Sequence, residues 1–104
     1  MSYLALLLAG MLLCNGIPHV VAGLLGQRFF TPWTPPGGTK LASPVQNFLW
    51  GAGNLLAGLW IVRHFDSQNV PHGAMAAGLG FLAAGTFLSG HFAKGLEVLR
   101  KGGK

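Results

Sequence analysis

Residues 2–26 read SYLALLLAGMLLCNGIPHVVAGLLG, a run with no Lys, Arg, Asp or Glu. A helix needs about 20 apolar residues to cross the hydrocarbon core of a bilayer, so this run is long enough and leaves room for tilt. Its middle is unusual, because Asn15, Gly16, Pro18 and His19 follow one another closely there. The stretch therefore predicts a membrane-spanning helix that is weakened near its centre.

Two further apolar runs follow, PVQNFLWGAGNLLAGLWIV over residues 44–62 and a Gly- and Ala-rich run over about 72–92. A proline- and glycine-rich loop over 27–43 separates the first two, and residues 93–104 form a basic tail. So few segments cannot close a barrel, and backbone groups in lipid must bond internally. We expect one all-α domain with three transmembrane helices, the first kinked at Pro18.

The composition supports an integral membrane protein. Hydrophobic residues make up 51% of the chain and charged residues only 9%, whereas soluble domains carry roughly a quarter charged residues. The net charge of +5 does not indicate nucleic-acid binding, because no basic face alternates with aromatic residues. The expected partner is the lipid bilayer.

The distribution of cations predicts the orientation. In a three-span chain Arg63 lies on one side and the other six cations lie opposite, namely Arg28, Lys40, Lys94, Arg100, Lys101 and Lys104. Because cytoplasmic segments are enriched in Lys and Arg, we expect the N-terminus outside and the C-terminus in the cytoplasm of a bacterial inner membrane. No basic region precedes the leucine-rich start, so we expect a retained first helix rather than a cleaved signal.

Polar residues recur on one face of each of the first two spans. Asn47, Gly51, Asn54 and Gly58 are spaced at i, i+4, i+7 and i+11, which is helical spacing. We expect this stripe to meet the stripe of the first span, with Asn54 bonding the Cys14 carbonyl that proline leaves free. The predicted intramembrane polar cluster comprises Asn15, Pro18, His19, Asn47, Asn54, Ser89 and His91.

Small residues predict close helix packing. In the third span they are spaced by about one turn, a pattern that lets helix backbones approach each other in lipid. The predicted packing positions are Gly51, Gly58, Ala76, Gly80, Ala84 and Gly85. Gly73 and Gly78 extend the small surface further, so we expect the chain to act by packing, with copies of itself or as an accessory subunit of a membrane complex.

Other functions remain open at this stage. Asn15, His19, Asn47 and Asn54 would line the path of a homo-oligomeric carrier or channel for a small neutral solute. His19 and His91 invite a haem, and a connector cluster of His64, Asp66 and His72 invites a metal. Neither set matches a specific motif, so we expect no cofactor. Both acids lie outside the spans, which argues against an enzyme and against carboxylate-driven transport.

Three short motifs carry a resemblance. NGIPH in the first span, FFTPW in the loop and NFLWGAGN in the second span together resemble a group of short, uncharacterised bacterial inner-membrane proteins. The aromatic loop is also typical of an interfacial anchor or of a docking segment for a partner. The resemblance implies an inner-membrane location and no particular activity.

Overall fold

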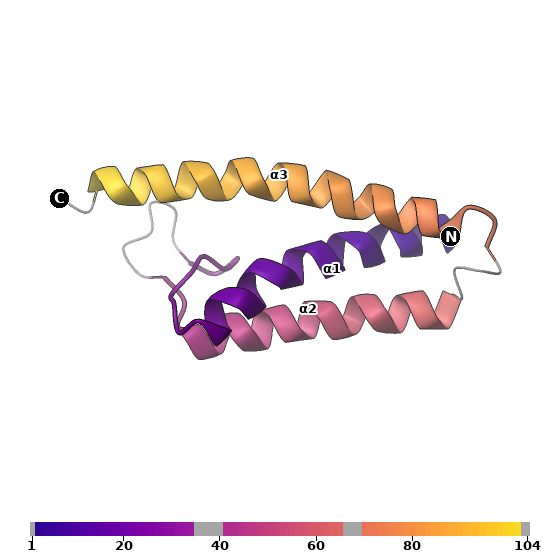
Figure 1. Cartoon of the computed structure of the whole chain (residues 1–104), viewed down its shortest axis with the longest axis horizontal. Helices are drawn as coiled ribbons and strands as arrows, with labels where there is room; N and C mark the ends of the chain where they lie inside the picture. The colour runs from indigo at the N-terminus through magenta and orange to yellow at the C-terminus, as the bar shows by residue number, and fades with distance from the viewer. Residues whose placement is uncertain (1, 35–40, 66–69, 103–104) are drawn as a thin grey trace.

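The computed structural model describes residues 2–34, 41–65 and 70–102, and these form an all-α protein, as predicted. Its helices are α1 (Ser2–Leu24), α2 (Pro44–Phe65) and α3 (Gly73–Gly102). They run up, down and up, and α1 lies between α2 and α3 (Figure 1). Both outer helices contact α1, but within the described part of the chain they do not contact each other. The bundle is therefore a single layer of helices with α1 in its centre.

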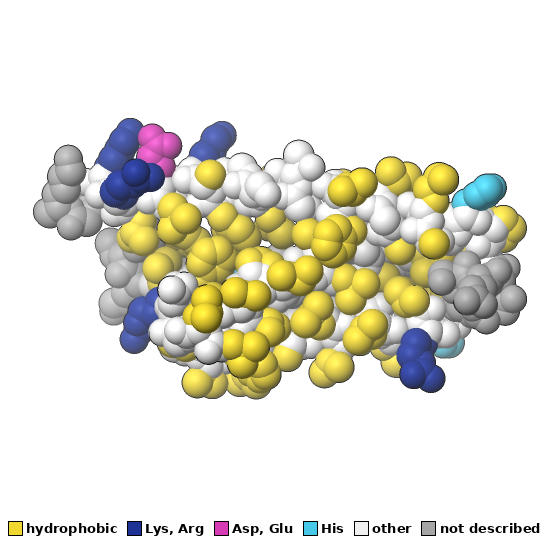
Figure 2. All heavy atoms as spheres, in the orientation of Figure 1, with side chains coloured by type: hydrophobic (Ala, Val, Ile, Leu, Met, Phe, Trp, Pro, Cys, Tyr) yellow, Lys and Arg dark blue, Asp and Glu magenta, His cyan; other side chains and the backbone are white. Residues whose placement is uncertain are grey.

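Two of these helices, α1 and α3, are long and apolar enough to cross a membrane. Helix α2 is about as long as α1, but no stretch of it reaches the same apolar level. The prediction of transmembrane helices is thus supported for two segments, and the third span stays a prediction. Figure 2 shows hydrophobic side chains over the length of the bundle and the cations gathered towards its ends.

Local signals set the ends of the first two helices. At the end of α1, Gly26 has a φ of 72°, and the amides of Gly26 and Gln27 bond back to the carbonyls of Gly23 and Ala22. This is a Schellman motif, for which glycine is the preferred residue. At the start of α2, the backbone and side chain of Ser43 bond reciprocally to Gln46 at 3.0 and 3.1 Å, which is a capping box.

Helix α1 continues through Pro18 without an unwound turn. The Asn54 side chain does not meet the carbonyl of Cys14, so that prediction is wrong. Its Nδ2 atom donates instead to the carbonyl of Trp50 one turn back in the same helix, at 2.8 Å. Such a bond to the carbonyl one turn back is common for polar side chains within a helix, and a bend at Pro18 stays a prediction.

Helix α3 is longer than the predicted third span, because residues 93–102 of the basic tail continue the helix. Leu96, Glu97 and Leu99 are good helix formers, and Glu97 pairs with Lys101 at 3.3 Å across one turn. Arg100 and Lys101 also lie in the last turn, where cations interact favourably with the helix dipole. The predicted third span is therefore only a portion of one long helix.

The described part of the loop folds back against the end of the bundle where α1 ends and α2 begins, which we call the loop end. Phe29 and Ala42 pair as an isolated antiparallel bridge, with N···O distances of 3.2 and 3.0 Å. The rings of Phe29 and Phe30 pack on Phe92 of α3, at centroid distances of 4.8 and 6.1 Å. These contacts place the loop beneath α1 and α3 and close one end of the layer.

Candidate functional site

Asn47 joins the loop to the first turn of α2. Its Nδ2 atom lies 3.1 to 3.2 Å from the carbonyl oxygens of Phe29, Ala42 and Ser43, and its side chain is fully buried. Because these carbonyls only accept, the amide nitrogen must face them and the Oδ1 atom must face the opposite way. Asn47 is thus held in one orientation, with its acceptor turned towards α1.

His19 of α1 meets that acceptor. The distance between His19 Nδ1 and Asn47 Oδ1 is 2.8 Å, and the imidazole is only 2% exposed. Since Oδ1 cannot donate, we assign the hydrogen of this bond to Nδ1, which makes Nε2 the acceptor of the neutral ring. His19 therefore has one nitrogen committed to α2 and one available for another group.

A second polar pair lies one helical turn away. Asn15 Nδ2 donates to Asn54 Oδ1 at 3.1 Å, and Asn54 is buried. The two predicted polar stripes thus face each other along the α1–α2 interface. Amides in an apolar environment are costly unless they are paired, so these bonds set the register of the two helices. They also argue against a wet path lined by the same side chains.

Helix α3 contributes aromatic side chains and a histidine at the same level. The ring of Phe92 packs edge-on against His19 at 6.0 Å, and His91 stacks on Phe87 at 5.6 Å with an interplanar angle of 11°. Ser89, which we expected in the polar cluster, is elsewhere. It lines a separate cavity beside Pro18, and its hydroxyl donates to the carbonyl of Gly85 in its own helix at 2.7 Å.

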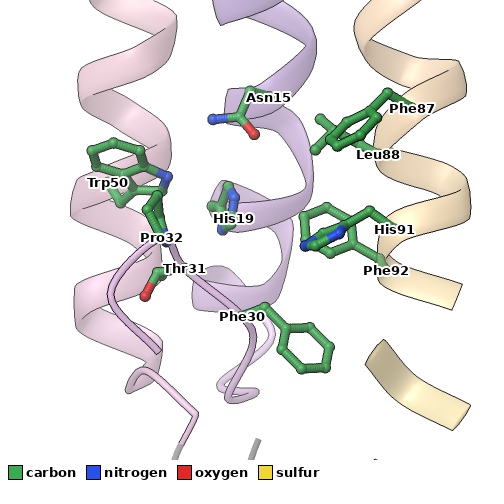
Figure 3. A pocket seen from close by; sticks show the side chains of 10 residues that line it. All are labelled: Asn15, His19, Phe30, Thr31, Pro32, Trp50, Phe87, Leu88, His91 and Phe92. Atoms are coloured by element: carbon green, nitrogen blue, oxygen red, sulfur yellow. The ribbon is translucent and has the colours of Figure 1, made fainter. Parts of the chain in front are cut away.

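A pocket of about 150 Å³ lies where the three helices and the loop meet, and we call it the loop-end pocket. Figure 3 shows its lining side chains converging from α1, α2, α3 and the loop. They are Asn15, His19, Phe30, Thr31, Pro32, Trp50, Phe87, Leu88, His91 and Phe92. The lining contains aromatic and neutral polar side chains and no Lys, Arg, Asp or Glu.

Two polar atoms of this lining have no partner. In the part of the chain that the structure describes, the buried side-chain nitrogen and oxygen atoms without a hydrogen bond are Trp50 Nε1 and Thr31 Oγ1. Sequence reasoning missed both residues as site residues, although they belong to the NFLWG and FFTPW motifs. The signal that could have identified Trp50 is its position on α2. It is an aromatic side chain with a hydrogen-bond donor, and it lies one turn from Asn47 and one turn from Asn54.

An apolar groove adjoins the loop-end pocket. This groove has a volume of about 320 Å³ and shares Asn15, Phe87 and Leu88 with the pocket. Its remaining lining consists of Leu8, Met11, Leu12, Asn54, Ala83 and Ala84. The aromatic pocket at the loop end thus adjoins an apolar groove that follows α1 towards the middle of the bundle.

The expected packing residues lie at the two helix interfaces. A Cβ at Gly51 would fall 2.6 Å from the backbone nitrogen of Val20, and one at Gly58 would fall 3.0 Å from the carbonyl of Ala9. On α3, Gly80 faces the backbone of Leu7 in the same way. Ala84 is buried, Ala76 is half-buried, and Gly85 lies beside the Cys14 sulfur.

The geometry gives little support to the haem and metal sites that the sequence suggests. His19 and His91 do line one pocket, but a cavity of about 150 Å³ holds a single six-membered ring rather than a tetrapyrrole. Across residues 2–34, 41–65 and 70–102, no three His, Cys, Asp or Glu side chains are placed to hold a metal ion. Asp66 of the proposed connector cluster lies outside those ranges, and His64 stacks on Trp60 at 4.9 Å.

Comparison of the chain with protein-family models, with curated proteins and with solved structures finds no match. The site must therefore be interpreted from its own geometry. That geometry is a pair of helix-joining hydrogen bonds, a small aromatic pocket and an apolar groove.

Proposed function

We propose that this chain is a three-span integral membrane protein of a bacterial inner membrane that acts by helix packing, as a homo-oligomer or as an accessory subunit of a membrane complex, and not as an enzyme. The three short motifs that resemble bacterial inner-membrane proteins are consistent with this location. The proposal rests on how each helix distributes its polar and small residues between inner and outer faces.

The outer surface of α2 supports a third span. Its buried positions are Asn47, Gly51, Asn54 and Gly58, which all turn towards α1. Large apolar side chains are exposed instead, namely Val45, Phe48, Leu49, Leu56, Leu59 and Trp60. The surface that α2 would present to lipid is therefore apolar, even though the average over its sequence is not.

The ends of the bundle support the proposed orientation. Arg28, Lys94, Arg100 and Lys101 lie in the loop and in the C-terminal part of α3, whereas Arg63 lies at the opposite end of α2. Anionic lipid headgroups and the positive-inside bias both favour the cation-rich end on the cytoplasmic side.

The observation that carries the packing function is a set of small residues that none of the three described helices covers. Gly53 and Ala57 on α2, and Ala74 and Gly78 on α3, are exposed pairs spaced by four residues. A Cβ at Gly53 or Gly78 would meet no atom within 4 Å, in contrast to the glycines that face α1. In lipid, such pairs favour the close approach of another helix.

The test is the assembly state of the full chain after mild extraction into native nanodiscs. We expect a mass above that of the monomer, from copies of the chain or a co-purifying membrane protein. Gly53→Leu and Gly78→Leu should reduce this assembly. Gly90→Leu is the matched control, because Gly90 is equally open but lies about 120° around α3 from Gly78. A parent protein that is only monomeric and without a partner would refute the proposal.

A further inference from the structure

The loop-end pocket contains hydrogen-bonding capacity that the protein does not use. Thr31 is only 8% exposed, and Trp50 Nε1 is shielded from solvent, yet neither polar atom has a partner. Folded proteins pair nearly all buried polar groups, and an unpaired one in a low-dielectric setting is costly. Both side chains line the same pocket, and in Figure 3 the Trp50 nitrogen lies on the side of the indole that faces α1, so a guest that reaches this nitrogen can satisfy it.

The polarity of these groups defines the guest. An indole nitrogen only donates, so the guest must present at least one acceptor oxygen, whereas the threonine hydroxyl can donate or accept. No charged side chain lines the pocket to balance a carboxylate or an ammonium group. In Figure 3 the Trp50 nitrogen lies on the edge of the indole that faces α1, and Thr31 lies below it, nearer the loop. An uncharged carbonyl compound fits this arrangement.

The shape of the pocket favours a flat ring. Its walls are aromatic, with Trp50 on α2 and the stacked Phe87 and His91 on α3. The planes of Phe30 and Phe92 are also nearly parallel, at 11°. A cavity of about 150 Å³ is known to accommodate a benzene ring. The head of the guest is therefore a single planar ring rather than a larger cofactor.

The adjoining groove defines the rest of the guest. It begins at side chains shared with the pocket, is lined mainly by Leu, Met, Ala and Phe, and follows α1 away from the loop end. Its volume of about 320 Å³ suits a narrow chain rather than a second helix. A linear apolar tail attached to the ring would leave the pocket along this groove.

We infer that the loop-end pocket and its groove bind a single-tailed lipid with an uncharged, carbonyl-bearing planar head, of the isoprenoid quinone class. Trp50 donates to a carbonyl of the head from its Nε1 atom. The tail lies between α1 and α3. This binding function goes beyond the packing role, which uses the outer faces of α2 and α3 and leaves the groove free.

The test uses the full chain in quinone-free phosphatidylcholine nanodiscs, titrated with decylubiquinone and corrected with empty nanodiscs. We expect saturable binding that Trp50→Phe weakens by about fivefold to tenfold, because only the N–H donor is lost. The matched control is Trp60→Phe, since Trp60 is absent from both linings.

Two further probes separate the head from the tail. Decylbenzene keeps the ring and the tail but has no carbonyl. It should therefore bind at least fivefold more weakly than decylubiquinone, and Trp50→Phe should not change its affinity. Ala83→Phe fills the groove and should weaken decylubiquinone, but not the tail-less 2,3-dimethoxy-5-methyl-benzoquinone. Ala93→Phe, outside the groove on the same helix, is the control.

The outcomes that would overturn the inference are specific. Equal affinity for decylubiquinone and decylbenzene would mean that the polar atoms of the loop-end pocket bind only water. Equal affinity of Trp50→Phe and Trp60→Phe for decylubiquinone would mean the same. Tighter binding of monodecanoylglycerol would overturn the planar head. Because Trp50→Phe leaves Gly53 and Gly78 untouched, its assembly state should not change, so failure here would be distinguishable from failure of the packing proposal.

Discussion

The two interfaces of α1 are built differently. Towards α2, paired side chains meet, with His19 on Asn47 at 2.8 Å and Asn15 on Asn54 at 3.1 Å. Towards α3, within the described ranges, no side-chain hydrogen bond joins the two helices, and the backbone of Gly10 instead packs against that of Ala77. Directional bonds specify register on one side, and close packing specifies distance on the other.

This difference explains where the loop-end pocket forms. Small residues bring α1 and α3 together near Gly10 and Gly80, in the N-terminal half of α1. Towards the loop end the α3 side chains become large, with Phe87 and Phe92 in place of glycine and alanine. The same helix pair is thus held apart by aromatic rings at one end, and the space beside those rings is the pocket.

The largest expected effect comes from breaking the glycine-based interface. In Gly80→Val, the new side chain would fall on the backbone carbonyl of Leu7, so α3 must move as a whole. We expect a loss of about 3 kcal/mol of stability in monomeric detergent micelles. The measurement is an unfolding titration followed by circular dichroism. Gly90→Val, in open space on α3, should change little, and equal losses for both would contradict the interface described above.

The next effect comes from breaking the hydrogen-bonded interface. Asn47→Leu removes the acceptor for His19 Nδ1 and the donor to the loop carbonyls, so we expect a loss of about 2 kcal/mol. Hydrogen exchange should also rise around Phe29. Adding His19→Phe should restore part of the stability, because no buried ring nitrogen is then left unpaired. If the loss of stability in the double variant equals the sum of the losses in the two single variants, the bond between His19 and Asn47 contributes little to stability.

A smaller effect is expected for the second polar pair. A double-mutant cycle with Asn15→Ala and Asn54→Ala should give a coupling energy of about 1 kcal/mol, since side-chain bonds between membrane helices are modest. The same unfolding titration supplies all four free energies. Strict additivity would show that these amides lie near each other without interacting.

The smallest effect is expected for an ion pair that lies outside both interfaces of α1. The Glu97–Lys101 pair is on the exposed end of α3, so Glu97→Gln should cost only about 0.3 kcal/mol, and less in high salt. Thermal unfolding at low and high salt is the measurement. A loss as large as that of Asn47→Leu would indicate that this end of α3 is coupled to the rest of the bundle.

Much of the fold could be predicted from local patterns. The i, i+4 and i+7 spacing of Asn47, Gly51 and Asn54 is enough to place them on one helical face, because helix geometry is local. Pro44 after Ser43 likewise marks the start of α2 within one residue. The continuation of α3 beyond Phe92 does not follow from the apolar run, because Lys, Arg and Glu extend a helix about as well as Leu does after the run has ended.

The candidate site was less predictable. Asn15, His19, Asn47, Asn54 and His91 were singled out because polar side chains in an apolar run stand out. Ser89 shares that signal, but its helix turns it towards a different cavity. Trp50 and Thr31 carried no such signal, because an aromatic residue and a loop threonine are ordinary at a membrane surface.

The sequence by itself determined that the chain is helical, where its apolar runs lie and which residues of each run share a face, since these follow from composition and helical period. Only the tertiary structure decided that α1 is the central helix, that the Asn54 amide donates to the Trp50 carbonyl and not to the Cys14 carbonyl, and that a loop and three helices line one pocket. Such facts depend on contacts between residues far apart in the chain, where the distances between helices and the direction of each side chain are set jointly.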